Sequence, residues 1–268
     1  MSKVLMAVLL GVLVGCAGAP QAPADATRDL APGGKLRAAI NTGNAVLAQK
    51  DAATGELKGV SVDLARELGR RLGVPVELVN YDAAGKVAGD ARNNKWDVAF
   101  LALDPQRAQD IDFTAPYVNI EGGYMVPKDS KLQKIEDLDA KGIRIAVGNK
   151  SVYDLYLTRT IKNAELVRAP TTPETVPLFL DRKLEAAAGI KAPMAKFAAT
   201  HPNVRLIPGR FMVIEQAMAM PKGKDAGYRY VRQFVEDMKA NGFVARGLER
   251  SGQGDAEVAP PAAAGGKG

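Results

Sequence analysis

The 268-residue sequence contains one cysteine, Cys16, and one histidine, His201. A single cysteine excludes a disulfide bond within the chain. One thiol and one imidazole also provide no cluster of soft ligands for zinc or a related transition metal. His201 falls in a turn-like THPN segment and is expected to face solvent. We therefore predict a protein that uses neither a metal ion nor another cofactor.

Aromatic residues are also scarce, at 6% of the chain, and the 36 lysines and arginines are dispersed along it. The net charge is +6, but no basic cluster is interleaved with aromatic residues, so nucleic-acid binding is not expected. The sequence also lacks a Gly-x-Ser-x-Gly motif, zinc-ligand spacing and a phosphate-binding loop. Only Glu121 and Glu215 stand out as candidates for acid–base catalysis.

Long hydrophobic runs are missing except near the start, where residues 4–14 read VLMAVLLGVLV. This run is too short for a permanent transmembrane helix, and Lys3 precedes it, as in a secretory signal peptide. Residues 13–16 (LVGC) resemble the bacterial lipobox. That resemblance implies cleavage before Cys16 and lipidation of its thiol, which would anchor the protein to a membrane. A plain secretory peptide cut near Ala17–Ala19 is the alternative.

Two segments are rich in alanine, proline and glycine and carry little apolar bulk. Residues 17–34 are predicted to be a flexible tether after the signal peptide of residues 1–16. Residues 251–268 have the same composition and are predicted to be a disordered tail. The folded body is therefore expected to span residues 35–250.

The most informative stretch is residues 96–117, WDVAFLALDPQRAQDIDFTAPY. Its apolar run Val98–Leu101 is typical of a strand buried on both faces. Asp104 and Pro105 follow as a helix start, an oxygen-bearing cap and then a proline. This pattern places Arg107 in the first helical turn, just past the carboxyl end of a strand. Open α/β sheets bind their ligands there.

An arginine in the first turn of a helix is unfavourable, because the positive end of the helix dipole repels it. A nearby anion would compensate, and a guanidinium can hold a carboxylate through two parallel hydrogen bonds. Arg107 is therefore a candidate for binding a carboxylate. A surface arginine paired with Asp110 or Asp104 is the alternative.

Three strings in this stretch resemble the periplasmic amino-acid-binding proteins, the bacterial extracellular solute-binding family 3. They are residues 96–98 (WDV), 104–108 (DPQRA) and 111–117 (IDFTAPY). Residues 55–68 (GELKGVSVDLAREL) resemble a fourth string of the same family. In that family the arginine that matches Arg107 holds the α-carboxylate of the ligand.

The rest of the body alternates strand and helix patterns, which predicts βαβ units and parallel sheets. Near the middle, a strand over 143–147 leads into a glycine turn, 148–150, and Ser151 is expected to cap the next helix. The other expected strands are 35–40, 74–79, 165–168, 184–190, 204–207 and 211–220. The other expected helices are 60–73, with Ser61 as its cap, and those near 173–181, 192–200, 225–241 and 242–250.

The resemblance implies an α/β fold of the two-lobed periplasmic binding protein type (type II), working as a monomer. Each lobe would be a sheet flanked by helices. Lobe 1 would comprise residues 35–119 and 215–250, and lobe 2 residues 120–214. Two crossings, near 118–120 and 213–215, would form a two-strand hinge.

The residues expected to bind the ligand surround the predicted cleft. They are Arg107, Ala102, Asn44, Tyr117, Glu121, Lys150 and Ser151. Two departures from the family concern residues expected to contact parts of an amino acid other than its carboxylate. Ile190 or its neighbour stands where the family has an aspartate for the ammonium, and Asn44 stands near the place of an aromatic residue.

These departures leave the ligand open. Glu121, next to the predicted hinge, is one candidate partner for an ammonium group, and Glu215 is a weaker one. Alternatively, Glu121 is a solvated residue or pairs with Lys150 or Arg144. If neither glutamate acts, the ligand is a carboxylate without an ammonium, such as an organic acid, and Lys150 would suit that anion.

The resemblance implies a periplasmic, lipid-anchored receptor that hands a small carboxylate-bearing ligand to the permease of an ABC importer. Closure of two lobes around the ligand would present a new surface to the permease. A sensory or accessory receptor without an importer is one alternative. A periplasmic dehydratase-like enzyme is another, because a few members of this superfamily have that activity.

Overall fold

The computed structural model describes residues 22–254 and 256–263. The predicted signal peptide and Cys16 lie outside these residues. Within the described ranges, no helix combines the length and the apolar character that crossing a membrane requires.

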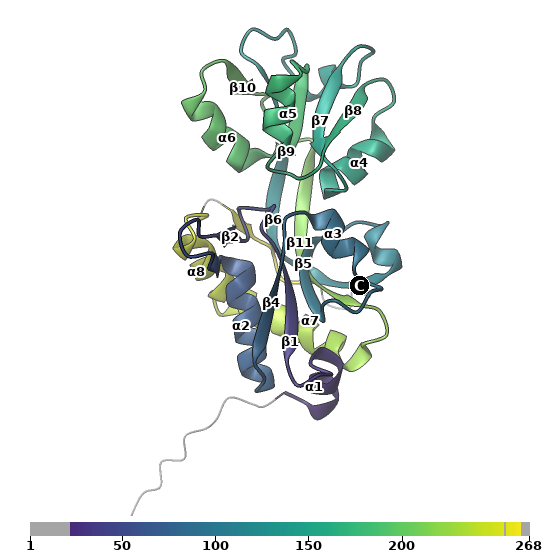
Figure 1. The fold of residues 1–268 in the computed structure, drawn as a ribbon, viewed down its shortest axis with the longest axis vertical. Coiled ribbons are helices and arrows are strands. Elements are labelled where there is room, and N and C mark those ends of the chain that lie inside the picture. Colours follow the sequence, from purple (N-terminus) through teal and green to yellow (C-terminus); the bar gives the residue numbers. More distant parts are fainter. Residues whose placement is uncertain (1–21, 255, 264–268) are drawn as a thin grey trace, which may run out of the picture.

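The protein consists of two α/β lobes that are stacked along the long axis of the molecule (Figure 1). In lobe 1, β1 pairs in parallel with β4 on one side and β5 on the other. In lobe 2, β7 pairs in parallel with β8 and β9 in the same way. The strands are β1 (Leu36–Asn41), β4 (Val76–Tyr81), β5 (Val98–Ala102), β7 (Arg144–Gly148), β8 (Glu165–Ala169) and β9 (Ala186–Ile190).

Two long antiparallel strands, β6 (Ile111–Pro127) and β11 (Met212–Pro221), run through both lobes and join the sheets into one (Figure 1). β11 pairs with β5 in lobe 1, and β6 pairs with β9 and with the short strand β10 (Val204–Leu206) in lobe 2. Ile120 of β6 pairs with Ile214 of β11 in the stretch that connects the strands of lobe 1 with those of lobe 2. The crossings predicted at 118–120 and 213–215 lie in this paired stretch.

Helices cover the sheets of both lobes (Figure 1). Lobe 1 carries α1 (Ala24–Leu30), α2 (Val60–Leu72), α3 (Ala84–Gly89), α7 (Asp225–Ala240) and α8 (Phe243–Arg250). Lobe 2 carries α4 (Val152–Thr160), α5 (Thr175–Asp181) and α6 (Lys191–Thr200). A small hairpin of β2 (Gln49–Lys50) and β3 (Leu57–Lys58) lies between β1 and α2 in the chain, with Gly55 in its loop at a positive φ of 73°.

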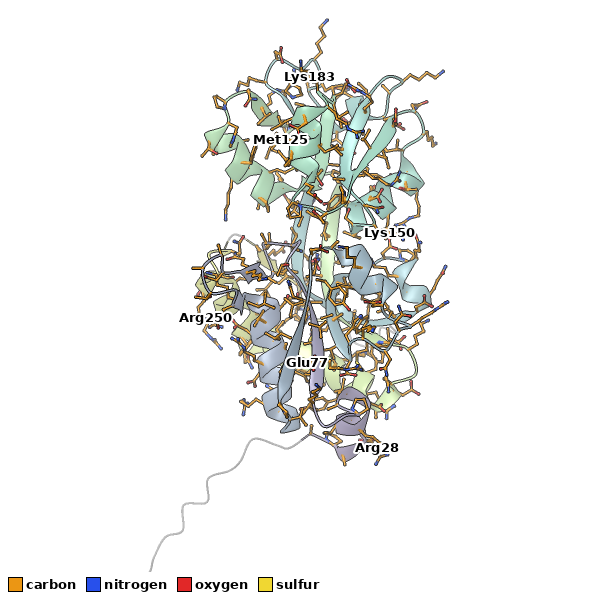
Figure 2. The ribbon with its side chains drawn as sticks, viewed as in Figure 1. Arg28, Glu77, Met125, Lys150, Lys183 and Arg250 are labelled. Carbon is orange, nitrogen blue, oxygen red and sulfur yellow. The ribbon has the colours of Figure 1, made fainter. Side chains whose placement is uncertain are left out.

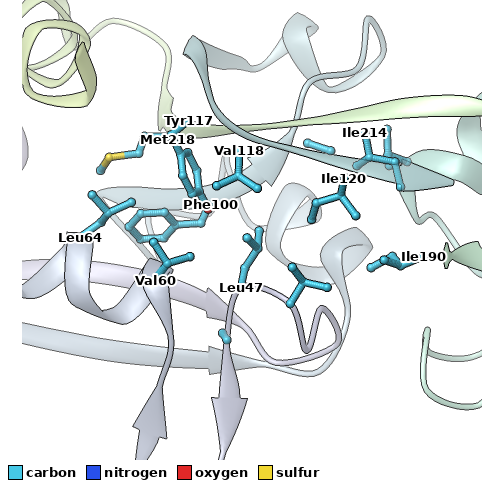
Figure 3. Close-up of a cluster of buried hydrophobic side chains, with 14 of the residues drawn as sticks. Leu47, Val60, Leu64, Phe100, Tyr117, Val118, Ile120, Ile190, Ile214 and Met218 are labelled. Atoms are coloured by element: carbon cyan, nitrogen blue, oxygen red, sulfur yellow. The ribbon is translucent and has the colours of Figure 1, made fainter. Parts of the chain in front are cut away.

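The helix predicted over 60–73 is α2, and its apolar stripe packs against the lobe 1 sheet. Figure 3 shows Val60 and Leu64 of this helix beside Phe100 of β5. The helix ends at Gly73, which has the left-handed conformation that favours glycine (φ 69°). Its start differs from the prediction. Gly59 is the N-terminal cap, and the Ser61 hydroxyl lies within the first turn, 3.1 Å from the Tyr117 hydroxyl.

The flexible tether predicted for residues 17–34 is wrong for residues 24–30. These residues form α1, in which Ala26 and Leu30 are buried. The helix packs against α7, and the Gly227 amide donates a hydrogen bond to Asp29 (3.0 Å). A seven-residue helix has little intrinsic stability, so this tertiary packing holds it in place.

The disordered tail predicted for residues 251–268 is also wrong for part of its length. Glu257 and Val258 form β12, which pairs antiparallel with Asn119 and Val118 of β6. Ala259 follows and is buried. The tail therefore adds a strand to β6 on lobe 1, beside the stretch that crosses between the lobes.

Candidate ligand-binding site

The carboxyl ends of four parallel strands converge where the two lobes meet. In lobe 1 these are β1 and β5, and in lobe 2 they are β7 and β9, with α4 following β7. Each pair of ends flanks a point where the strand order reverses, which is where α/β sheets bind ligands. The cavity between them is lined by Asn41, Asn44, Ala84, Leu101, Ala102, Arg107, Ser151, Val152, Tyr153, Ile190, Ile214 and Gln216.

The cavity measures about 30 Å³. One water molecule needs roughly 10–15 Å³ of such volume. The cavity therefore has room for only a few water molecules, and a ligand as large as an amino acid would fit beside Arg107 only if the lobes moved apart. A larger hollow of about 330 Å³ is lined by Val46, Ile120, Lys191 and other residues of both lobes.

Arg107 is the charged side chain among the described residues of the cavity wall. The helix predicted to carry it is only a 3₁₀ turn, Arg107–Gln109, because the chain enters β6 at Ile111. Asp104 Oδ1 accepts the Gln106 amide at 2.9 Å, but the residue at the cap position of the 3₁₀ turn is Gln106, which makes no side-chain cap hydrogen bond. The structure thus corrects both the predicted cap and the predicted length of the helix, because the turn begins at Arg107 and has three residues.

The Arg107 guanidinium bridges the lobes. Nη1 donates to the Ala102 carbonyl at the end of β5, and Nη2 donates to the Lys150 carbonyl in lobe 2, each at 3.0 Å. Nε is buried and has no hydrogen-bond partner among the described residues. The residue is 5% exposed, and burial lowers its pKa to about 10, against the opposing effect of Asp104. The group is therefore charged at neutral pH and retains an unused donor.

The neighbouring carboxylates are engaged with other arginines. Asp104 Oδ2 accepts a hydrogen bond from Arg159 of α4 at 2.7 Å, an ion pair that links the lobes in addition to the hydrogen bond between Arg107 and the Lys150 carbonyl. Asp154, at the start of α4, pairs with Arg168 at 3.0 Å and accepts the Lys150 amide at 2.7 Å. Within the described ranges, the Arg107 guanidinium thus has carbonyl partners but no ion-paired carboxylate of its own, which is the electrostatic setting of an anion site.

The structure brings four of the seven predicted ligand-binding residues together around the cavity: Arg107, Ala102, Asn44 and Ser151. Ser151 caps α4 as predicted, because its hydroxyl accepts the Asp154 amide at 3.1 Å. Asn44 replaces the expected aromatic residue, and its Oδ1 accepts the Val46 amide at 3.2 Å. The additional lining residues that sequence reasoning missed include Gln216 and Tyr153.

Tyr117 and Lys150 do not present their side chains to this cavity. Tyr117 is fully buried in the lobe 1 core, where its ring packs edge-on against Phe100. Lys150 has a left-handed backbone (φ 55°) and an exposed side chain, and it contributes its carbonyl to Arg107. Figure 2 labels Lys150 beside the junction of the lobes.

Glu121 lies outside the Arg107 cavity and is part of the larger hollow. Its carboxylate accepts hydrogen bonds from Lys191 (2.7 Å) and Arg210 (3.0 Å), and the contact with Lys191 contributes most to lowering its pKa. The pairing with Lys150 or Arg144 considered from the sequence does not occur; Arg144 instead pairs with Glu185 at 2.9 Å.

The Glu121 ion pairs predict a small acid-sensitive contribution to stability. The folded-state pKa is lowered, so the contribution is present above the unfolded-state pKa and disappears as the pH falls through the folded-state pKa. The side chain is 42% exposed, which limits the contribution to about 0.2–1 kcal/mol.

We expect the unfolding free energy of wild type, measured by urea titration, to fall more steeply between about pH 5 and pH 3 than that of Glu121→Gln. Glu249→Gln is the control, because Glu249 is exposed on α8 and makes no ion pair among the described residues. Identical pH profiles for wild type and Glu121→Gln would contradict the expectation.

The two lobes and the two crossing strands have the fold of type II periplasmic binding proteins, and solved structures share this fold. A cysteine-binding protein from Campylobacter jejuni superposes with a TM-score of 0.73 at 21% identity, covering 84% of this chain and 92% of that chain. The ancestral amino-acid-binding protein AncCDT-1, a precursor of cyclohexadienyl dehydratase, gives a TM-score of 0.71 at 22% identity, covering 84% and 98%. These similarities show the shared fold.

Residues 36–251 match the bacterial extracellular solute-binding proteins, family 3, and the chain belongs to this family. A probable amino-acid ABC transporter-binding protein of Haemophilus influenzae is 25% identical over 195 residues. The match covers 70% of this chain and 74% of that relative.

Proposed function

We propose that this protein is the substrate-binding component of an ABC importer and captures a small carboxylate-bearing ligand between its lobes. The observation that carries the proposal is Arg107, a buried and charged guanidinium with a free Nε donor in the inter-lobe cavity. A carboxylate would supply both the missing acceptor and the missing negative charge. The similarity to an amino-acid ABC transporter-binding protein supports the same reading.

The contacts of Arg107 suggest how binding and closure are coupled. The guanidinium touches the ends of β5 and of the β7–α4 turn, and the Asp104–Arg159 pair lies beside it. A ligand bound to Arg107 would neutralise the charge that closure buries, so the closed state would gain stability with ligand present. The closed surface would then be the one that the permease engages.

We propose a receptor rather than an enzyme. Among the described residues of the cavity wall, the titratable side chains are Arg107 and Tyr153. Burial is the main cause that raises the pKa of Tyr153, so neither group is suited to exchange protons near neutral pH. The periplasmic location and the lipid anchor at Cys16 are part of the proposal and rest on the sequence.

The proposal is tested by calorimetric titration of the purified protein with a panel of amino acids and plain carboxylates, combined with small-angle scattering. We expect at least one carboxylate to bind and to reduce the radius of gyration as the lobes close. Loss of uptake of that compound after deletion of the gene would support import; normal uptake would favour a receptor without an importer. Absence of any carboxylate binding would overturn the proposal.

A further inference from the structure

The charges around the cavity leave one positive charge uncompensated. Three arginines contribute to this charge balance: Arg107 in the cavity wall, and Arg159 and Arg168 beside it. Arg159 pairs with Asp104, and Arg168 pairs with Asp154. Among the described residues, the Arg107 side chain forms hydrogen bonds only with the carbonyls of Ala102 and Lys150, and Asp104, the carboxylate that acts on its pKa, is paired with Arg159. A monoanion would therefore balance the site. A zwitterion carries no net charge, and its ammonium would add a second cation to a water-poor cavity.

The remainder of the wall offers an ammonium group no carboxylate. None of the described residues that line the cavity is an aspartate or a glutamate. Apolar side chains of lobe 2 and of the crossing strand β11, namely Val152, Ile190 and Ile214, fill much of the wall. Figure 3 shows Ile190 and Ile214 continuing the hydrophobic cluster toward the junction of the lobes.

The glutamates of the crossing strands β6 and β11, Glu121 and Glu215, do not line the cavity. Side chains alternate between the faces of a strand, and Ile214 and Gln216 of β11 line the cavity. Glu215 between them is exposed and lines a separate surface groove. Glu121 pairs in register with Val213 and is held by Lys191 and Arg210. Recruiting Glu121 would require breaking both of these ion pairs.

From this arrangement we infer that the ligand is a small carboxylate without an ammonium group: a 2-oxo or 2-hydroxy acid with a compact apolar body. The inference rests on the proposed function, in which Arg107 holds the carboxylate. Uncharged amides supply the remaining polar contacts. The side chain of Gln216 and the Nδ2 atoms of Asn41 and Asn44 form no hydrogen bonds within the described part of the chain, so they can donate to a carbonyl or hydroxyl oxygen.

The test is calorimetric titration of the protein with ligand sets that share one carbon skeleton and differ only at the second carbon. One such set is 3-methyl-2-oxobutanoate, 2-hydroxy-3-methylbutanoate and L-valine; sets based on alanine, leucine and the other proteinogenic amino acids complete the panel. We expect the best oxo or hydroxy acid to bind at least about tenfold more tightly than its amino counterpart.

Tighter binding of an amino acid than of its oxo and hydroxy counterparts, lost in Arg107→Met, would overturn the inference and leave the proposed function intact. Failure of every carboxylate in the panel to bind would overturn the proposed function and this inference with it. The two failures are therefore distinguishable within one set of titrations.

A matched pair of variants tests the charge argument directly. Ile190 lines the cavity and is the N-terminal cap residue of α6, a position that favours aspartate and asparagine. Ile190→Asp would supply the missing carboxylate, and Ile190→Asn has nearly the same shape without the charge. We expect amino-acid affinity to rise at least about tenfold in Ile190→Asp only. An equal gain in both variants, or a gain in neither, would contradict the charge argument.

Discussion

Arg107→Met is expected to abolish most of the affinity for carboxylates while leaving the protein folded. Loss of a buried charge-assisted contact to a ligand costs about 2–5 kcal/mol, which is roughly 30-fold or more in the dissociation constant. The fold should tolerate the change, because Arg107 is a buried cation that forms no ion pair with a carboxylate in the part of the chain that the structure describes. Replacing a poorly compensated buried charge by an apolar side chain is often neutral or stabilising.

Calorimetric titration with the best carboxylate measures the affinity, and urea unfolding measures the stability. Arg107→Lys is the conservative comparison; it keeps a charge but loses the planar guanidinium and should bind with intermediate affinity. Arg92→Met is the matched control on the same lobe, because Arg92 is exposed and pairs with Asp110. An Arg107→Met variant that binds like wild type would show that the carboxylate is held elsewhere.

The part of the site that could be predicted from the sequence is the part built by local geometry. Asp104 and Arg107 lie on a short connection after β5, and Ser151 follows β7, so their positions at strand ends could be inferred from apolar runs and caps. The convergence of these strand ends follows from the βαβ order of each lobe.

The part that could not be predicted depends on the direction of side chains. Glu121 follows Ile120 in β6, and both residues line the larger hollow rather than the cavity beside Arg107. The Glu121 carboxylate is directed to Lys191 and Arg210, and no local sequence pattern reveals these distant partners. Lys150 was expected to offer its ammonium, but the left-handed turn offers its carbonyl instead. Tyr117 belongs to a ligand-linked motif, yet its hydroxyl meets Ser61 in the core.

In the fold as well, elements with a local sequence pattern could be predicted, and elements that depend on distant partners could not. Periodic apolar residues located α2 and α7, and continuous apolar runs located β5 and β9, because these patterns reflect burial along a whole element. β12 has two residues and depends on a partner more than a hundred positions away. Composition alone suggested disorder there, since no local pattern reports a distant partner.

The helix α1 carries the second large expected effect, which concerns stability. Leu30 is fully buried at the end of this helix and belongs to the main hydrophobic core. Leu30→Ala should lower the unfolding free energy by about 2–5 kcal/mol, the usual range for a buried leucine truncated in a packed core. A leucine in a flexible tether would instead leave the unfolding free energy unchanged, so the size of the effect discriminates between the two descriptions of this segment.

Arg28→Ala is the matched control on the same helix, because Arg28 is exposed and lies on the outer side of α1 (Figure 2). It removes a side chain of the same segment without opening the contact between α1 and α7, and its effect should stay within about 0.5 kcal/mol. Urea titrations of the two variants and wild type provide the comparison. Equal stability of Leu30→Ala and Arg28→Ala would mean that α1 does not pack on lobe 1 in solution. In that case the folded body would begin near β1, as the composition of the segment suggests.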